Sequence, residues 1–481
     1  MTLHGPSRQA LFRHVGRFVL MAALVALAAT VPTSMSSELA RGAGGSLKAA
    51  AALPAGHDMA VHEGVASCGS TTCHGRQEAT GPRVRQNELM IWQDPTSLTG
   101  AHARAWAVLA GARSRDIARR LGIGDPQASS ECIACHGDPA PNRGARFLQA
   151  DGVGCEACHG GSGGMAGGQA GWLASHAAVG AQHADNVARG LWDVATPGVR
   201  ADVCLDCHFG SAKPGQFVTH RIMAAGHPRI AFELDLFTSL QSHHDEDDDY
   251  GRRKGIVPGV KIWAVGQAKA VSRALALYPS RAGGAFPEFY FFDCRSCHRT
   301  FSDDLNVDIT ARTNPARPLP PGAVVWNDEN LIMLAAAAKV AAPDLAVELA
   351  ARSRDFHKAV NSDRATAITA ASALAATADR LAARFEASAF APAQTFAMID
   401  TVLLADAARL TDYQGGAQAV MAADTLIAAL VKDGALSAEQ AATLRPRLDR
   451  AYAAARDANR FEGARLRTAL ADVAAGVRGL K

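Results

Sequence analysis

Ten cysteines and the histidines that follow them are the residues of this sequence best suited to chemistry. They form five motifs, numbered here in chain order. The first, Cys68–His74, has four residues between its cysteines. The other four have the regular pattern Cys-x-x-Cys-His: the second is Cys132–His136, the third Cys155–His159, the fourth Cys204–His208 and the fifth Cys294–His298. Two thiols at this spacing reach the two vinyl groups of one porphyrin, and the adjacent histidine then lies beneath the iron as its proximal ligand. The motifs therefore predict five covalently bound haem c groups.

The histidines decide between haem attachment and the other uses of cysteine. An exported chain could form disulfides, and Cys-x-x-Cys pairs could bind zinc, but neither use requires a histidine after every second cysteine. The first motif is less regular, so a disulfide between Cys68 and Cys73 remains its alternative. We expect thioether bonds at Cys68, Cys73, Cys132, Cys135, Cys155, Cys158, Cys204, Cys207, Cys294 and Cys297, and proximal ligation by His74, His136, His159, His208 and His298.

The amino-terminal residues have the pattern of an export signal. Three arginines and no acidic residue precede an unbroken apolar run from Phe18 to Ala29. The run has 12 residues, whereas a membrane span needs about 20, so a cleaved signal is favoured over a retained anchor. Haem attachment in bacteria takes place outside the cytoplasm. We therefore expect residues 1–29 to be a signal peptide, residues 30–56 a flexible tether, and the mature protein to be periplasmic.

The charge balance argues against nucleic acid as a partner. The chain has 49 basic and 46 acidic residues. Removing the expected signal takes away three arginines and leaves 49 − 3 = 46 basic residues against 46 acidic ones. Each haem adds two propionates, so the haem-loaded protein is expected to be acidic.

The elements that position the motifs fall into two parts. Residues 57–325 are rich in glycine and histidine, with short helical patches such as Ala101–Gly122 and loops such as Gly160–Gly171. Haem faces are large and apolar, so a chain that wraps five haems needs few long amphipathic elements of its own. We expect a mainly α protein whose loop-rich multihaem core has few or no strands.

Residues 326–481 contain no cysteine and are expected to form an alanine-rich helical bundle. Ser437 and Gln440 predict a capping box, and Pro446 is expected to interrupt the last helix. The predicted helices are Leu331–Val340, Leu345–Val360, Ala365–Phe385, Phe396–Leu410, Ala417–Val431 and Ala438–Leu470.

Three segments carry a resemblance to a known family. They are Gly64–His74, Asp151–Gly160 and the stretch from Val218 to Leu234. Over about residues 60–300 the chain resembles the multihaem cytochromes of the cytochrome c-554 family. Their haem core is similar to those of hydroxylamine oxidoreductase and pentahaem nitrite reductase. The resemblance implies a largely α-helical, loop-rich fold with stacked haem pairs and mostly bis-histidine ligation.

Histidines outside the motifs are candidates for the distal position of each iron. The resemblance points to His102, His176, His220 and His227, and His62 lies just ahead of the first motif. His357 is the single histidine of the expected bundle and would ligate the last haem if the bundle packs against it. The alternative for each is a surface or capping histidine held by hydrogen bonds. His243 and His244 precede an acidic run, so they belong either to a solvated loop or to an iron.

The allocation of these histidines separates an electron carrier from an enzyme. A second imidazole on the iron favours electron transfer, whereas an open position admits a substrate. The sequence lacks the Cys-x-x-Cys-Lys motif of pentahaem nitrite reductase, and Tyr290 is expected to be a packing residue. We expect a periplasmic pentahaem carrier between a redox protein donor and acceptor. The alternatives are an oxidoreductase that acts on a small nitrogen or sulfur compound at one open haem, and a subunit whose bundle docks a membrane quinone-linked complex.

Overall fold

The computed structural model describes residues 59–81, 85–164, 170–244, 250–252, 255–280, 286–298, 316–319 and 323–481. The expected signal peptide (1–29), the expected tether (30–56) and the acidic residues 245–249 lie outside these ranges. Within them the chain is helical, with no strand and two isolated bridges, His62 with Arg143 and Phe292 with Trp326. This confirms the predicted mainly α fold. None of the described helices is long and apolar enough to cross a membrane.

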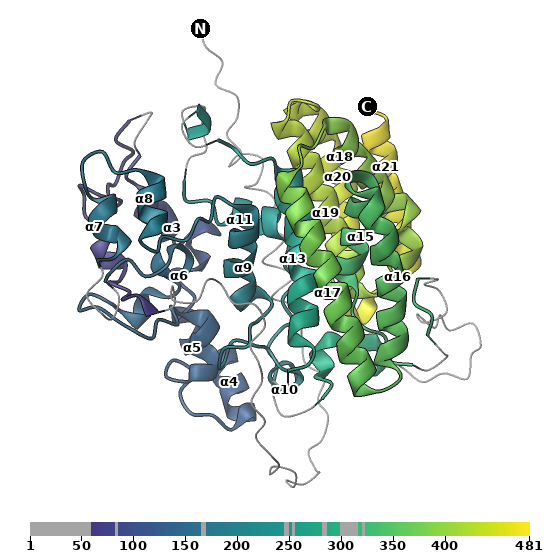
Figure 1. Ribbon diagram of the computed structural model, residues 1–481, viewed down its shortest axis with the longest axis horizontal. Coiled ribbons are helices and arrows are strands. Elements are labelled where there is room, and N and C mark those ends of the chain that lie inside the picture. Colours follow the sequence, from purple (N-terminus) through teal and green to yellow (C-terminus); the bar gives the residue numbers. More distant parts are fainter. Residues whose placement is uncertain are drawn as a thin grey trace.

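The part of the chain that carries the first four motifs consists of short helices joined by loops, on one side of the molecule in Figure 1, and the first motif itself lies in a loop. These helices are α3 (Glu88–Trp92), α4 (Ala112–Leu121), α5 (Ser130–His136), α6 (Glu156–His159), α7 (Trp172–His176), α8 (His183–Ala188), α9 (Pro197–His208), α10 (His220–Ala224) and α11 (Leu234–Leu240). Single 3₁₀ turns accompany them at η2 (Val65–Ser67), η3 (Thr99–Ala101), η4 (Ala107–Ala110) and η5 (Gln149–Asp151). Of two more 3₁₀ turns, η7 (Phe289–Phe291) precedes the fifth motif and η8 (Cys294–Ser296) begins at its first cysteine.

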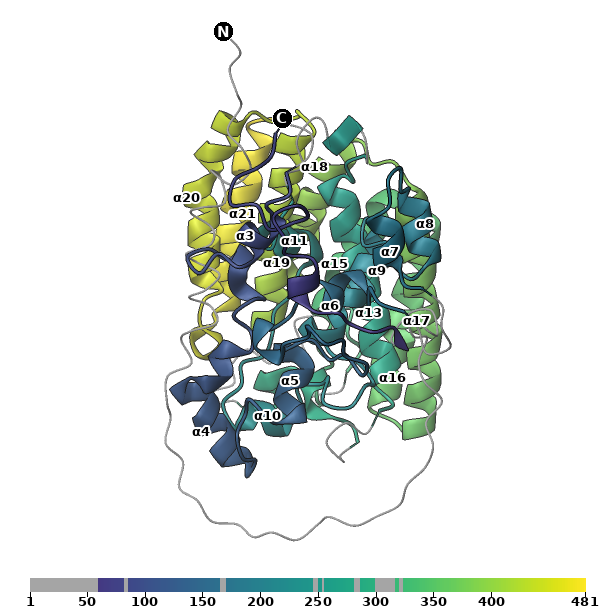
Figure 2. The same ribbon diagram turned by 90° about the vertical axis from the view of Figure 1, so that its left-hand side faces the viewer.

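Longer helices form a bundle on the other side of the molecule (Figure 1). They are α13 (Gly259–Leu277), α15 (Glu329–Ala341), α16 (Pro343–Val360), α17 (Arg364–Ala387), α18 (Pro392–Asp400), α19 (Tyr413–Lys432), α20 (Ala438–Ala454) and α21 (Gly463–Arg478), with short turns η9 (Thr401–Ala405), η10 (Ala407–Arg409) and η11 (Ala458–Arg460). A single hydrophobic core runs through these helices. The view in Figure 2, turned by 90°, shows the bundle as a wall behind the short helices.

Helix α13 belongs to the bundle although it lies within residues 57–325. Thirteen of its 19 residues are buried, among them Trp263 with no exposed surface. A helix that is apolar on nearly all sides must be covered on all sides. α17 covers one face of α13, and α9 and α11 cover another. This one helix therefore joins the motif-bearing part to the bundle.

The end of the bundle differs from its sequence pattern at Pro446. The prediction that Pro446 interrupts the helix is wrong, because α20 continues through it to Ala454. Leu444 and Leu448 on either side are buried, so packing maintains the helix despite the missing backbone donor. The predicted capping box is confirmed: Ser437 Oγ accepts from the N–H of Gln440 at 3.1 Å, and Gln440 Oε1 accepts from the N–H of Ser437 at 2.7 Å.

Candidate haem sites

Three of the motifs occupy the last turn of a helix. α5 ends at His136, α6 at His159 and α9 at His208. Within each motif the second cysteine and the histidine follow the first cysteine by three and four residues, which places all three side chains on one helix face. A helix end therefore presents two thiols and an imidazole together, as attachment to one porphyrin requires.

The first motif reaches the same closure without a helix. In the third motif the N–H of His159 donates to the carbonyl of Cys155 at 2.9 Å. In the first motif the N–H of His74 donates to the carbonyl of Cys68 at 3.1 Å, although its loop is two residues longer. The extra residues lie in an exposed bulge, and the histidine keeps its position relative to the first cysteine. All ten cysteines are free, so the structure contains no disulfide between Cys68 and Cys73.

The motifs converge on one large cavity of about 2300 Å³. This exceeds the roughly 300–1,000 Å³ of a pocket for one drug-sized ligand. Residues of all five motifs line it, including His74, His136, His159, His208 and Cys294. Its walls are mostly apolar, as the faces of a porphyrin require. The cavity thus has the size and the thiol donors for several haems.

Each motif histidine lies opposite a histidine from elsewhere in the chain. The pairs, with the distance between their ring centroids, are His74 with His176 (5.9 Å), His136 with His227 (6.3 Å), His208 with His102 (6.0 Å) and His298 with His220 (6.0 Å). The structure therefore brings together four of the distal candidates, His102, His176, His220 and His227, with four motif histidines.

This separation fits two imidazoles on opposite sides of one iron. A metal–imidazole bond is about 2.0 Å long and a ring nitrogen lies about 1.1 Å from its ring centroid, so two axial imidazoles have centroids about 6.2 Å apart. Burial lowers the pKa of His102 to about 4 and that of His208 to about 3. Both rings are therefore neutral at pH 7, the form that ligates a metal.

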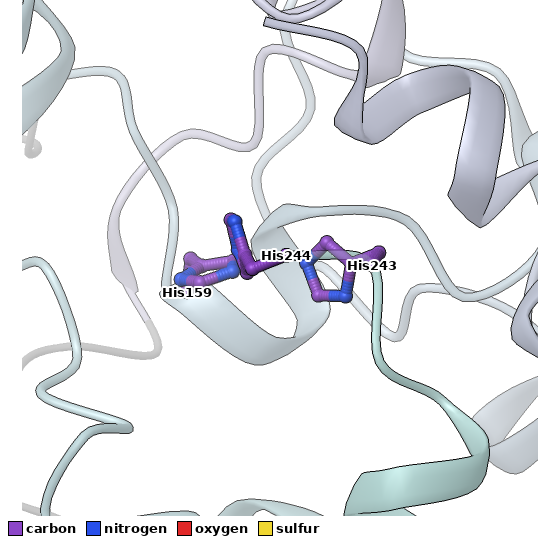
Figure 3. Close-up of side chains that lie close together, drawn as sticks. All are labelled: His159, His243 and His244. Carbon is purple, nitrogen blue, oxygen red and sulfur yellow. The ribbon is translucent and has the colours of Figure 1, made fainter. Parts of the chain in front are cut away.

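The third motif has two such neighbours. The ring centroid of His159 is 6.2 Å from that of His243 and 6.4 Å from that of His244 (Figure 3). One nitrogen from each of the three rings lies within 4.8 Å of the others. The two histidines follow the end of α11 at Leu240, which holds them over the cavity. The sequence left these two histidines open between a solvated loop and an iron, because the acidic run beside them is typical of a solvated loop.

Two other predicted ligands have different surroundings. The Nδ1 atom of His62 lies 2.8 Å from Oδ2 of Asp138, and both side chains are buried. His62 lines the cavity, but the five motif histidines already have partners. His357 lies inside the bundle on α16, only 1% exposed, with Nε2 3.7 Å from Oδ2 of Asp328. The structure does not support His357 as a ligand of the last haem.

The bundle contacts the fifth motif through a different residue. Nε2 of Gln414, in the first turn of α19, lies 3.4 Å from Sγ of Cys294. Gln414 and its neighbour Tyr413 line the cavity, and so does Tyr452 of α20. The expected contact between the bundle and the last motif is therefore present, but α19 provides it instead of α16.

Motifs that are distant in sequence lie side by side. The thiol of Cys68 contacts that of Cys155, and the thiol of Cys135 contacts that of Cys207. Gln216 bridges the second and fourth motifs, because its Nε2 donates to the carbonyl of Ala134 at 3.0 Å and lies 3.9 Å from Sγ of Cys207. The structure thus couples the first motif to the third and the second to the fourth.

The polar atoms around the cavity also fit haem. Nε1 of Trp192 and Nε of Arg229 are buried and have no hydrogen-bond partner among the described residues. Both side chains line the cavity. Buried donors without partners are costly, and carboxylates satisfy them well. Trp192 and Arg229 would serve haem propionates.

Comparison with known proteins agrees with this site. Residues 67–160 match the family model described as cytochrome c554 and c-prime. The match spans the first three motifs and covers less of the chain than the resemblance seen in the sequence. Neither curated proteins nor solved structures give a match. With its cysteines and histidines arranged as haem attachment requires, this chain resembles the cytochrome c554 family, and the match supports a c-type cytochrome with covalently bound haem c.

Proposed function

We propose that the chain is a periplasmic pentahaem electron carrier in which every iron has two histidine ligands. One observation carries the proposal: each of the five motif histidines has a second histidine at a ring-centroid distance of 5.9–6.4 Å. Haem c supplies reversible one-electron redox chemistry when it is bound. Two imidazoles on an iron leave no position for a substrate, so this ligand set favours a carrier over an oxidoreductase.

The exposure of the motifs suggests where redox partners dock. Cys73 of the first motif and both cysteines of the fifth are exposed, whereas those of the second, third and fourth motifs are partly covered. Electron transfer between proteins requires a short distance between cofactors. We therefore assign the first and fifth motifs to the donor and acceptor sides, with a redox protein or a membrane quinone-linked complex as the partner. The periplasmic location rests on the apolar run from Phe18 to Ala29.

Haem counting and spectroscopy test the proposal. The haem-loaded protein should contain five haems per chain and lack its amino-terminal signal in an intact-mass spectrum. Replacing Cys68 and Cys73 by alanine should lower the count by one. The oxidised protein should be low-spin throughout in electron paramagnetic resonance and should bind cyanide and carbon monoxide slowly or not at all.

A matched pair of histidine variants isolates the ligands. His227→Ala should create one high-spin haem that binds carbon monoxide. His183→Ala should not, because His183 is an exposed histidine whose Nε2 lies 3.1 Å from Oδ1 of Asp193. A wild-type protein with a substantial high-spin signal that turns over hydroxylamine, nitrite or tetrathionate would refute the carrier and support the enzyme.

A further inference from the structure

The third motif differs from the other four in the number of its distal candidates. Each of the other motif histidines has one histidine outside the motifs at a ring-centroid distance of about 6 Å, but His159 has two. The interplanar angles, 77° for His243 and 88° for His244, do not separate the two. Their own ring centroids are 4.2 Å apart, so the two rings lie beside each other at the same distance from His159.

We propose that His243 and His244 are alternative distal ligands of the iron held by the third motif. The inference rests on the proposed haem set. Only one of the two imidazoles could hold the iron opposite His159 at a time. An exchange would replace one iron–imidazole bond by another and would transfer neither an electron nor a proton.

The two imidazoles differ in what lies beside their Nδ1 atoms. Nδ1 of His243 is 3.3 Å from the carbonyl oxygen of Gln241. Nδ1 of His244 is 3.9 Å from Oε1 of Glu88. A carboxylate beside a ligating imidazole makes that imidazole a stronger donor than a backbone carbonyl does, and a stronger donor favours the oxidised iron.

Glu88 also connects this choice to the first motif. Its Oε2 accepts a hydrogen bond from Nδ1 of His74 at 2.9 Å, while its Oε1 faces His244. The first and third motifs are adjacent through Cys68 and Cys155. His74 and His244 share the carboxylate of Glu88. A shift of His74 in the first motif therefore changes how well His244 competes with His243 as the distal ligand of the third motif. The pair of histidines therefore acts as a two-state element between neighbouring haem sites.

Single and double variants of the haem-loaded protein test the proposal. His243→Ala and His244→Ala should each remain low-spin, because the other imidazole takes the axial position. Only the double variant should show a new high-spin signal and bind carbon monoxide, and added imidazole should restore its low-spin signal. The haem of His243→Ala should have a lower midpoint potential than that of His244→Ala, because His244 carries the carboxylate partner.

His176→Ala is the positive control, because His74 has a single partner. A high-spin His176→Ala together with two low-spin single variants supports the inference. If one single variant of the pair alone is fully high-spin, that histidine is the only ligand and the inference is refuted, while the bis-histidine carrier stands. If His176→Ala stays low-spin, the pairing of the carrier proposal fails, and the double variant still decides between one and two ligands at the third motif. Haem content and far-ultraviolet circular dichroism verify that each variant is loaded and folded.

Discussion

Glu156 is the residue whose replacement best tests how the first and third motifs are held together. It lies between the cysteines of the third motif and is only 2% exposed. Its carboxylate accepts hydrogen bonds from the backbone N–H groups of Glu63 at 2.9 Å, Gly64 at 2.7 Å and Ser162 at 2.8 Å. Two of these donors belong to the segment that leads into the first motif. One buried carboxylate of the third motif therefore holds the segment that leads into the first motif in place.

The structure gives the expected magnitude. Glu156→Gln keeps one acceptor oxygen but replaces the other by an amide NH₂ group, which faces the N–H of Gly64 as a second donor. A hydrogen bond to a charged group contributes about 1.5–3 kcal/mol and an orphaned buried donor costs about 1–3 kcal/mol, so we expect a loss of about 2–4 kcal/mol in the free energy of unfolding. Urea denaturation of the haem-loaded protein, followed by circular dichroism and haem absorption, measures it.

Glu131→Gln is the matched control. Glu131 directly precedes the second motif, and its exposed Oε2 is 3.8 Å from Nη1 of Arg221. An exposed ion pair of this kind contributes about 0–1 kcal/mol. If the two variants lose the same stability, Glu156 does not anchor the two motifs. The structure predicts that only Glu156→Gln loses stability, and that its low-spin haem signals disappear at a lower urea concentration than those of Glu131→Gln.

Two further predictions concern the first motif and the bundle. Gly75→Ala should lower the haem count by one, because a Cβ atom there would lie 1.9 Å from the carbonyl oxygen of Gly69, whereas Gly81→Ala should leave it at the wild-type value, because nothing lies within 4 Å of that position. Equal haem counts in an assay of both variants would contradict the tight closure at His74. Burial lowers the pKa of His357 to about 4, so the unfolded chain, with its histidine pKa of about 6.5, takes up the proton first as the pH falls. This contributes stability that is full above about pH 6.5 and about 2 kcal/mol smaller by pH 5, and His357→Leu should flatten the pH dependence of urea unfolding by that amount. An unchanged pH dependence would show that His357 is protonated in the folded state.

The haem-attachment residues are predictable because their chemistry is local. A thiol, a second thiol and an imidazole must meet one porphyrin, so their order along the chain is constrained within a few residues. The longer loop of the first motif does not break this rule. The N–H of His74 still bonds to the carbonyl of Cys68, and the two extra residues are accommodated in the exposed bulge.

The distal histidines are set by tertiary structure, and sequence spacing alone does not identify them. His102 meets His208, and His220 meets His298, across long stretches of chain. The resemblance pointed to these residues, but not to His243 and His244. The sequence left His357 open only between an iron ligand and a surface histidine. The structure instead buries it with Ser353 and Phe356 at the spacing of one helix face, toward the core of the bundle.

The haem part and the bundle are not independent of each other, because α19 of the bundle also contacts the motif-bearing part. Fifteen of its 20 residues are buried. Along one face, Gln414 lies against Cys294, Nε2 of Gln418 donates to the carbonyl of Phe232 at 2.8 Å, and Oγ1 of Thr425 donates to Oε2 of Glu233 at 2.7 Å. Polar side chains at these positions of an otherwise apolar helix are used to bind the motif-bearing part. If the bundle docks a membrane complex, it must do so through the outer faces of helices such as α16 and α17, because α19 is already the wall of the haem cavity.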